Sequence, residues 1–255
     1  MAVPSLKPYE HVRFEETVPG LLEVHLHSGG ESLQWNGRAH DEIAEAFGDI
    51  ARDPDVRVVI VTGTGDTFSG PDAQEAGMPS LSTRQWEHIR WHGERLVMNL
   101  LEIQAPVIGC LNGPALRHPE IPLLGDIVLA ADDSAVQDTG HFLIGAAPGD
   151  GMHIVMPALL GPTRGRYFLI TGQKLTAGEA QQLGLVNEVM PREDLLPRAR
   201  ALAAEIATRN PLVLRYTRLL LTHQLKAMCH DLLGYGLALQ GLGVVDEGLR
   251  QEARA

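Results

Sequence analysis

The segment from Gln137 to Pro157 holds the residues of this sequence that are best suited to acid–base chemistry. It reads QDTGHFLIGAAPGDGMHIVMP and places His141, Asp150 and His153 around a loop rich in glycine. Such loops bring the backbone close to a ligand, and loops often carry binding and catalytic residues. A carboxylate on one nitrogen of a neutral imidazole leaves the other nitrogen free to accept a proton from water. We therefore take His141, oriented by Asp150, as the candidate base.

The local sequence leaves two other interpretations of Asp150 open. This residue precedes an apolar helical stretch, so its side chain could serve only as an N-cap. It also lies three residues before His153, and the two side chains could pair with each other at the helix start. A metal site formed by Asp150, His118, His141 and His153 is a further alternative, but no ligand spacing typical of zinc is present. We expect no metal ion.

The composition is typical of an ordinary globular protein. The 255 residues are 44% hydrophobic and 21% charged, with a net charge of -11 and only 5% aromatic residues. No run of Lys or Arg is present to follow a phosphate backbone, so nucleic acid is not an expected partner. No apolar run approaches the length of a membrane span. The absence of a signal pattern, and two cysteines without a disulfide framework, predict a cytoplasmic protein.

Strand and helix patterns alternate in the first half of the chain, which predicts an α/β fold. Alternating apolar and polar residues on either side of Pro19-Gly20 predict a hairpin. Continuous apolar runs predict buried strands, and helical periodicity separates them. The expected strands cover 12–16, 21–27, 56–62, 106–111, 126–131 and 135–137; the expected helices cover 39–52 and 84–102; a long loop is expected over 63–83.

The second half of the chain is predicted to be mainly helical. Thr176 and Glu179 form a capping box at the start of one helix. A last short strand is expected at 185–190, and an all-helical tail follows it. The other expected helices cover 152–160, 164–171, 195–208, 212–224 and 228–239. The tail suggests a packing or oligomerisation layer on an α/β core.

Five blocks of the chain carry a family resemblance. They read VRVVIVTGTGDTFSG, APVIGCLNGPA, GDIVLAADDSA, GAAPGDGM and GRYFLITGQKLTAGEAQQLGLVNEVMP. With them, nearly the whole chain resembles the crotonase (enoyl-CoA hydratase/isomerase) superfamily. The resemblance implies a crotonase-like spiral of ββα units over residues 1–195 and an α-helical C-terminal trimerisation region over residues 196–255. It also implies a homotrimer or a dimer of trimers, and a site that holds an enolate in an oxyanion hole.

Two turns depart from the usual pattern of that superfamily. Leu116–Glu120 stands where a Gly-rich turn usually grips a thioester carbonyl with backbone N–H groups, and Pro119 has no N–H. The loop Phe68–Asp72 replaces the usual Ala-Gly turn. His141 stands where hydratases carry a catalytic Glu, and Asp150 replaces a small residue. Both halves of the usual oxyanion hole are therefore changed.

These departures are similar to those of the β-diketone hydrolase branch, which does not use coenzyme A. The matching blocks are Leu33–Trp35, His118–Pro122, Gln137-Asp138, His141-Phe142 and Pro148–Gly151. The resemblance implies retro-Claisen hydrolysis of a small cyclic or bicyclic 1,3-diketone, with no cofactor. That branch places a carboxylate on a C-terminal helix, whereas the nearest position here is the amide Gln240.

Each site residue then has an expected role. His141 is expected to activate water with Asp150, and the carbonyl oxygens to accept hydrogen bonds from His118 and Trp35. Glu120 and Gln240 are further candidates for substrate binding. The alternatives are that His118 is a solvated loop residue, that Glu120 only caps a helix, and that Trp35 only fills the core.

Two other functions stay open at the level of the sequence. The first is an acyl-CoA hydratase or isomerase in which His141 replaces the catalytic Glu. The second is a non-catalytic protein with the crotonase fold.

Overall fold

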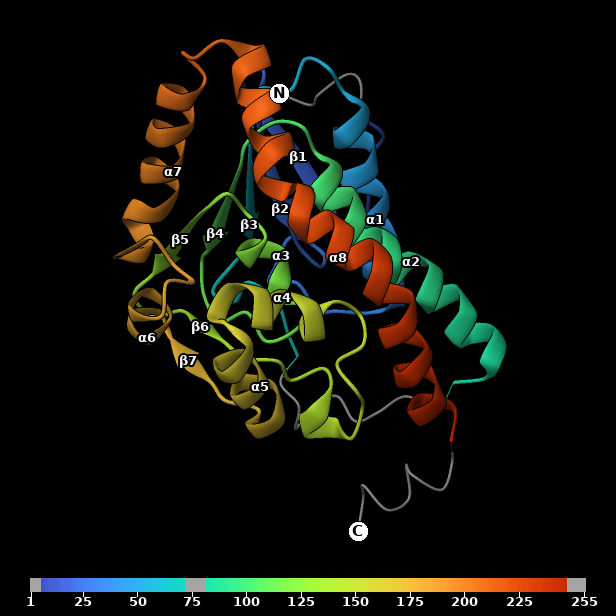
Figure 1. The fold of residues 1–255 in the computed structure, drawn as a ribbon. Helices are drawn as coiled ribbons and strands as arrows, with labels where there is room; N and C mark the ends of the chain where they lie inside the picture. Colours follow the sequence, from blue (N-terminus) through green and yellow to red (C-terminus); the bar gives the residue numbers. More distant parts are fainter. Residues whose placement is uncertain (1–5, 72–80, 247–255) are drawn as a thin grey trace.

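The protein is built around a six-stranded sheet, in a computed structural model that describes residues 6–71 and 81–246 (Figure 1). The strand order is β1-β2-β3-β4-β5-β8, and only β1 and β2 run antiparallel. The strands are β1 (Val12–Val18), β2 (Leu21–Leu26), β3 (Val58–Gly63), β4 (Val107–Leu111), β5 (Ile127–Ala131) and β8 (Glu188–Met190). The predicted α/β class and the N-terminal hairpin are confirmed.

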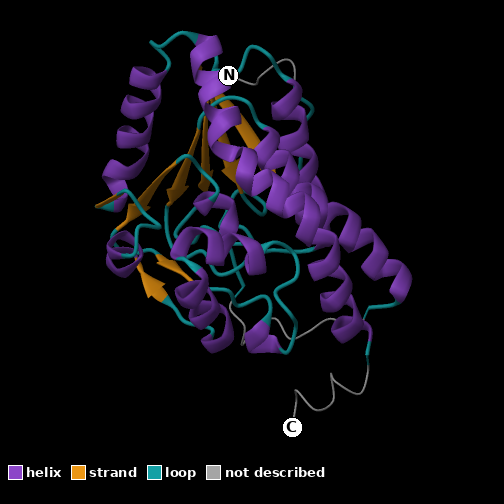
Figure 2. Cartoon of the chain, viewed as in Figure 1, coloured by secondary structure: helices purple, strands orange, loops and turns teal. Residues whose placement is uncertain are grey.

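Helices cover both faces of this sheet, which explains why its strands read as continuous apolar runs. In β3, Val59 and Val61 point into a core shared with three helices, whereas Val58 and Ile60 point into a smaller core shared with α7. Figure 2 shows the two layers on either side of the strands. The three helices are α1 (Gly37–Arg52), α2 (Thr83–Glu102) and α8 (Pro211–Val245); α7 spans Arg192–Ile206.

Several small elements complete the chain beside the sheet. Strands β6 (Ala135–Val136) and β7 (Leu175–Thr176) pair antiparallel. The remaining helices are α3 (Glu120–Leu123), a 3-10 turn η1 (Phe142–Ile144), α4 (Met152–Leu160), α5 (Pro162–Thr171) and α6 (Ala177–Gln182). The predicted capping box is present at α6, where the Thr176 hydroxyl accepts from the Glu179 N–H and the Glu179 carboxylate accepts from the Thr176 N–H.

The loops that follow the strands are joined by isolated β-bridges between single residues. Ala115, after β4, bridges to Ser69, after β3, and also to Val136 of β6. The segments that follow these three residues therefore start side by side at one edge of the sheet. This convergence brings together side chains that are far apart in the sequence.

Helix α8 differs from the sequence expectation. It is one helix of 35 residues, not two helices over 212–224 and 228–239. The expected break at Leu225-Lys226-Ala227 contains only good helix formers and no Gly or Pro, so nothing local ends the helix there. The continuous helix carries Leu237 and Gln240 back over the centre of the molecule.

An ion pair made by the buried Arg218 fixes the first half of α8 against the body of the protein. Arg218 is 2% exposed, and its Nε donates to Asp126 Oδ2 at 2.7 Å. The guanidinium also donates to the carbonyl of Ile103, and the Asp126 carboxylate accepts from the Val107 N–H at 2.7 Å. One charged group thus ties α8 to the end of α2 and to the start of β4.

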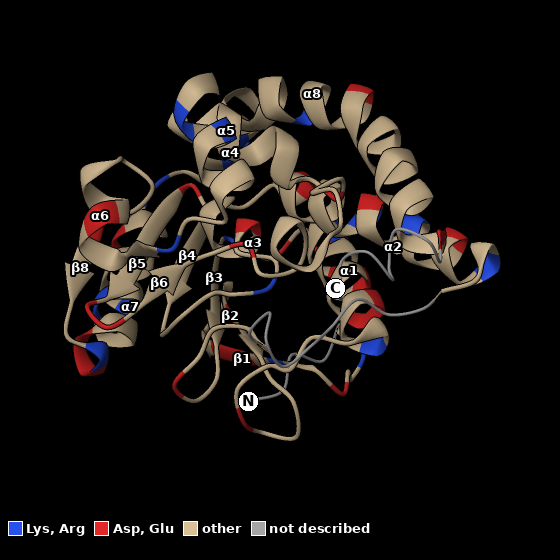
Figure 3. Ribbon diagram, turned by 90° about the horizontal axis from the view of Figure 1, so that it is seen from below, with Lys and Arg blue, Asp and Glu red and all other residues tan. Residues whose placement is uncertain are grey.

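Some expectations about the chain are not decided by this architecture. The proposed division between residues 195 and 196 falls inside α7, which packs on β3, β4 and β5; the division stays a prediction. Part of the expected 63–83 loop lies outside the described residues. Cys110 and Cys229 are free and buried, as expected. Basic and acidic residues are interspersed along the ribbon (Figure 3). None of the described helices is both long and apolar enough to cross a membrane.

A buried carboxylate links the sheet to α7 and gives the fold a pH dependence. Glu23 of β2 is fully buried and accepts from Arg200 Nε and Nη2 at 2.6 and 2.8 Å. Burial raises the pKa of Glu23, but Arg200 and His25 together lower it from 4.5 to about 2. Because the folded-state pKa is depressed, this stabilisation is complete above about pH 4.5 and is lost as the pH falls toward 2.

We predict that Glu23→Gln lowers the free energy of unfolding by about 1–3 kcal/mol at pH 7, the range for hydrogen bonds to charged groups. The variant should also show a flatter stability curve below pH 4.5, measured by urea unfolding at several pH values. Glu188→Gln is the matched control, because Glu188 pairs with Arg198 of the same helix on the surface. Equal effects of the two substitutions would contradict this prediction.

Candidate active site

A cavity of about 450 Å³ lies where the convergent loops meet α1, α2 and α8. Apolar side chains form much of its wall, which is typical of a site for a small organic molecule. Five of the six predicted site residues line it: Trp35, His118, His141, Asp150 and Gln240. The sixth, Glu120, lies behind His118. The apolar part of the wall comprises Pro71, Leu81, Trp86, Ile89, Ile144, Ala146, Leu237 and Val244.

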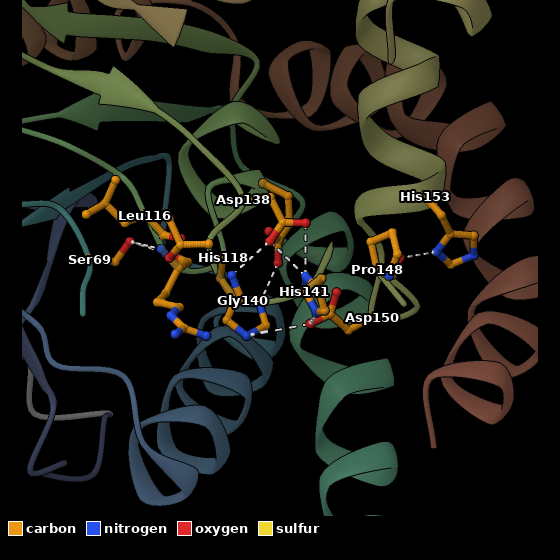
Figure 4. Close-up of polar contacts among 12 residues, drawn as sticks. Ser69, Leu116, His118, Asp138, Gly140, His141, Pro148, Asp150 and His153 are labelled. Carbon is orange, nitrogen blue, oxygen red and sulfur yellow. Dashed lines mark hydrogen bonds and ion pairs between the residues drawn. The ribbon is translucent and has the colours of Figure 1, made fainter. Parts of the chain in front are cut away.

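His141 is held between two buried carboxylates (Figure 4). Its Nε2 lies 2.9 Å from Asp150 Oδ2, so the predicted contact between these residues is present. Its Nδ1 lies 2.8 and 3.0 Å from the two oxygens of Asp138. The expectation that one ring nitrogen is free for water is therefore wrong, because Asp138 occupies it from three positions earlier in the same loop.

The two alternatives for Asp150 do not match the structure. The N-cap residue of α4 is Gly151, and this helix start has no side-chain cap. His153 points away from Asp150, with Nδ1 2.9 Å from the carbonyl oxygen of Pro148 (Figure 4). The φ of 127° at Gly151, a conformation that L side chains rarely adopt, marks the sharp turn between Asp150 and the helix.

The two carboxylates determine the protonation state of His141. An ionised carboxylate only accepts hydrogen bonds, so both ring nitrogens must donate and the ring is an imidazolium. Burial lowers the pKa of His141, but Asp138 and Asp150 together raise it well above 6.5. Burial raises the pKa of Asp150, whereas His141 and His118 lower it to well below its usual range. The proton that His141 and Asp150 share therefore stays on His141.

Asp150 is consequently the group of this pair that can accept a proton. Its Oδ2 accepts from His141, and its Oδ1 is buried with no hydrogen-bond partner among the residues that the structure describes. Asp150 also lines the cavity, whereas Asp138 does not. The sequence analysis placed the base on His141 and the orienting carboxylate at Asp150. The geometry instead places the orienting carboxylate at Asp138.

His118 is another polar residue in the wall of the cavity. Its Nδ1 lies 2.7 Å from Glu120 Oε1, and its ring stacks on Trp35 at 4.1 Å between centroids. Its Nε2 is 3.7 Å from Asp150 Oδ2, which is too long for a hydrogen bond. His118 is thus a buried wall residue and not a solvated one. Trp35 is also part of the wall.

Glu120 supports His118 and does not cap a helix. It is fully buried in the first turn of α3, where no side-chain cap is formed. His118 has a φ of 47°, the left-handed region that favours glycine, which costs a non-glycine residue about 1–3 kcal/mol. Its contacts with Glu120 and Trp35 offset this cost. Burial lowers the pKa of His118, but Glu120 and Asp150 raise it above its usual value.

Two backbone donors of the altered turns, the N–H groups of Arg117 and Gly70, are already engaged. The N–H of Arg117 donates to Ser69 Oγ at 3.3 Å, and the N–H of Gly70 donates to the carbonyl of Leu33 at 2.9 Å. Pro119 has no N–H to offer. These parts of the turns therefore provide no free pair of backbone donors for a thioester carbonyl. Asp72, at the end of the first turn, lies outside the described residues.

Gln240 reaches the cavity from α8, as the sequence suggested. It is buried, and its Oε1 lacks a hydrogen-bond partner in the described part of the chain. Close packing of α8 on the loop before α4 brings it there. A Cβ added at Gly149 would lie 2.1 Å from the carbonyl oxygen of Gly236, so only glycine permits this approach.

The sequence analysis assigned no role to Asp138 and did not consider His40. The sequence did carry a signal for Asp138: it lies three residues before His141, and a turn of that length can bring the two side chains together. His40 of α1 is buried in the cavity wall, edge-on to His118, and its Nδ1 has no partner among the described residues. Burial is the main cause that lowers the pKa of His40 to about 3, so the ring is neutral. The sequence signal for His40 was its position as a polar residue beside the apolar face of the helix.

Comparisons with known proteins found chains that are similar to this one in sequence and in fold. The family model for enoyl-CoA hydratase/isomerase matches residues 21–233. A β-diketone hydrolase from the cyanobacterium Anabaena, bound to (S)-3-oxocyclohexyl acetic acid, is 44% identical with a TM-score of 0.89, covering 93% of this chain and 95% of that chain. A crotonyl-CoA hydratase from Syntrophomonas wolfei is 31% identical over 178 residues, 69% of this chain and 68% of that protein.

A further solved structure shows the fold alone. It is an enoyl-CoA hydratase/isomerase from Mycobacterium paratuberculosis, 24% identical, with a TM-score of 0.86 over 96% of this chain and 98% of that chain. Together these likenesses confirm the predicted crotonase-like fold.

The engaged backbone donors generate a prediction about thioesters. Acetyl-CoA should show no tight, stoichiometric binding in calorimetric titration, because Arg117 and Gly70 cannot offer their N–H groups without breaking existing hydrogen bonds. Tight binding of one acetyl-CoA per chain would overturn this interpretation of the two turns.

Proposed function

The chain belongs to the enoyl-CoA hydratase/isomerase family, and within it we propose that the protein hydrolyses the carbon–carbon bond of cyclic or bicyclic 1,3-diketones. The observation that carries this proposal is the buried His141 between Asp138 and Asp150, at the wall of an apolar cavity. The Anabaena neighbour supports it, because the acid bound there carries a ketone and a carboxylic acid. Hydrolytic opening of a bicyclic 1,3-diketone gives these two groups.

The first step adds water to one carbonyl of the diketone. The Asp150 carboxylate accepts a proton from water as the water oxygen forms a bond to the carbonyl carbon, so negative charge moves from the carboxylate to the substrate oxygen. The imidazolium of His141 keeps Asp150 ionised before this step. The positive charge held beside the cavity by His141 also stabilises the oxyanion.

The second step breaks the bond between the attacked carbon and the carbon that lies between the two carbonyls. Its electron pair forms an enolate on the second carbonyl, and the attacked carbon becomes a carboxylic acid. Asp150 then returns its proton to the enolate carbon. A carboxylic acid of low pKa is a strong proton donor, so the same low pKa that makes Asp150 a weak base favours this last transfer. The balance is one diketone and one water to one keto acid.

His118 and Trp35 are placed to bind the carbonyl oxygens. We propose that His118 Nε2 donates to one of them, since Glu120 already occupies Nδ1. One donor of this kind contributes about 3 kcal/mol in comparable oxyanion sites. Trp35 would supply the apolar face and its indole N–H. Gln240 and the neutral His40 lie on the same wall and would contact the rest of the substrate.

The function is tested by comparing substrates of two classes. We expect the protein to open the bicyclic diketone that yields 3-oxocyclohexyl acetic acid, with the keto acid measured by chromatography. We expect no hydration of crotonyl-CoA. Turnover of crotonyl-CoA without diketone cleavage would favour the hydratase reading that the name of the Syntrophomonas relative suggests. If neither substrate is turned over, both the diketone hydrolase and the hydratase function are contradicted.

The charges around His141 predict opposite shifts in the pH profile of activity for the variants His141→Ala and Asp138→Asn. Without the imidazolium, the burial of Asp150 raises its pKa, so His141→Ala should lose most activity at neutral pH and its acidic limb should move to higher pH. Asp138→Asn removes a charge that raises the pKa of His141, so the alkaline limb should move to lower pH.

Asp150→Asn should cost orders of magnitude in kcat, with little further loss in the double variant His141→Ala/Asp150→Asn.

His153→Ala is the matched control, because this histidine bonds to the carbonyl of Pro148 and faces away from Asp150. Its pH profile should match that of the unchanged protein. Thermal unfolding must first show that each variant is folded. If Asp138→Asn leaves both limbs in place, Asp138 does not act through His141. Near-normal kcat in Asp150→Asn would remove the proposed proton acceptor.

We also propose that the chain assembles as a homotrimer or a dimer of trimers. The support is a set of apolar side chains on α5 and α8 that are exposed in the single chain. It comprises Tyr167, Ile170, Leu212, Val213, Tyr216, Leu220, Leu221, Tyr235 and Leu242. Patches of this kind usually mark protein–protein contacts.

A further inference from the structure

Three metal-ligating side chains meet on the α1–α2 pair, apart from the cavity. His88 and His92 lie one turn apart on α2, so both side chains fall on one face of that helix. Asp41 approaches them from α1. The Asp41 oxygens lie 2.7 Å from His88 Nε2 and 3.5 Å from His92 Nδ1. The three potential ligand atoms all lie within 4.8 Å of one another.

This cluster differs from two similar ones in the described residues. The clusters Glu10–His11–Glu42 and Glu15–Glu23–His25 each already hold a guanidinium, from Arg38 and Arg200 respectively. Within the described residues, Asp41 has ion pairs only with the two histidines. The negative charge of this cluster is therefore not neutralised by a lysine or an arginine.

His92 gives a second indication that this cluster serves a ligand. Its Nδ1 is buried and has no hydrogen-bond partner among the residues described, although it faces the Asp41 carboxylate. Leaving a buried polar atom unpaired usually costs about 1–3 kcal/mol. A cation between His92 Nδ1 and Asp41 Oδ1 would satisfy both atoms.

We propose that Asp41, His88 and His92 form a binding site for a divalent transition-metal ion such as Zn²⁺. Two imidazole nitrogens and one carboxylate oxygen are ligands that zinc accepts, and a fourth position is left for water. Ca²⁺ and Mg²⁺ prefer sites made of oxygen ligands alone. His88 is 60% exposed in its side chain, so its ring is free to adjust as the ion enters.

Such an ion would link the two helices that form one wall of the cavity. His40 and Gly37 of α1 line the cavity, as do Ile89 and Gly93 of α2. Asp41 is the neighbour of His40 in the chain, and His92 is the neighbour of Gly93. Binding would therefore hold α1 and α2 together directly behind this wall and raise the thermal stability of the protein.

The test uses the full chain without a polyhistidine tag, freed of metal by a chelator, and titrates it with ZnCl₂ in a calorimeter. We expect one Zn²⁺ per chain, and a rise in Tm of roughly 5 °C at a hundredfold excess over Kd. His88→Asn and Asp41→Asn should each weaken binding by more than about tenfold, since even the loss of an outer partner costs that much. His230→Asn, an exposed histidine on α8, should bind as the unchanged protein does.

Co²⁺ in place of Zn²⁺ reports the ligand set directly, through a visible absorption band that should disappear in His88→Asn. Tm values without metal show whether each variant is folded. Zinc binding that is unchanged in both variants would place the ion elsewhere and overturn the proposal. Absence of binding by the unchanged protein would overturn it as well.

Discussion

The imidazolium of His141, enclosed by the carboxylates of Asp138 and Asp150, is the interaction on which the site depends. Each of these charges would be costly to bury alone, by several kcal/mol. Together they satisfy one another, and the ring cannot turn without breaking contacts on both sides. The arrangement thereby keeps Asp150 ionised at the cavity wall although it is buried. The same contacts fix the positive charge of His141 at the cavity wall.

The scaffold serves this cluster by making strand ends converge. The bridges from Ala115 to Ser69 and Val136 bring the loops of His118 and His141 together, and α8 closes the cavity from above them. The same bridges explain why the N–H of Arg117 is already engaged. Ser69, which they hold beside the second turn, places its hydroxyl on the N–H of Arg117.

The sequence was informative where a signal was local or belonged to the family. Apolar runs located β3 and β4, the Thr176 capping box located α6, and the pairing of His141 with Asp150 followed from residues in one loop. Prediction from the sequence failed where the position of a side chain depends on the packing of several elements. The role of Asp138 depends on which ring nitrogen faces it, and the burial of His40 depends on how α1 packs on α2. The length of α8 was missed, although residues 225–227 contain no helix breaker.

The central claim is that water cleaves a carbon–carbon bond and that one proton returns to the carbon released. It is tested most directly by running the reaction with a bicyclic 1,3-diketone in H₂¹⁸O and, separately, in D₂O. The account predicts one ¹⁸O in the new carboxylic acid, and one deuterium of a single configuration on the carbon between the former carbonyls. Cleavage that places no ¹⁸O in the acid, or a diketone recovered unchanged, would contradict it.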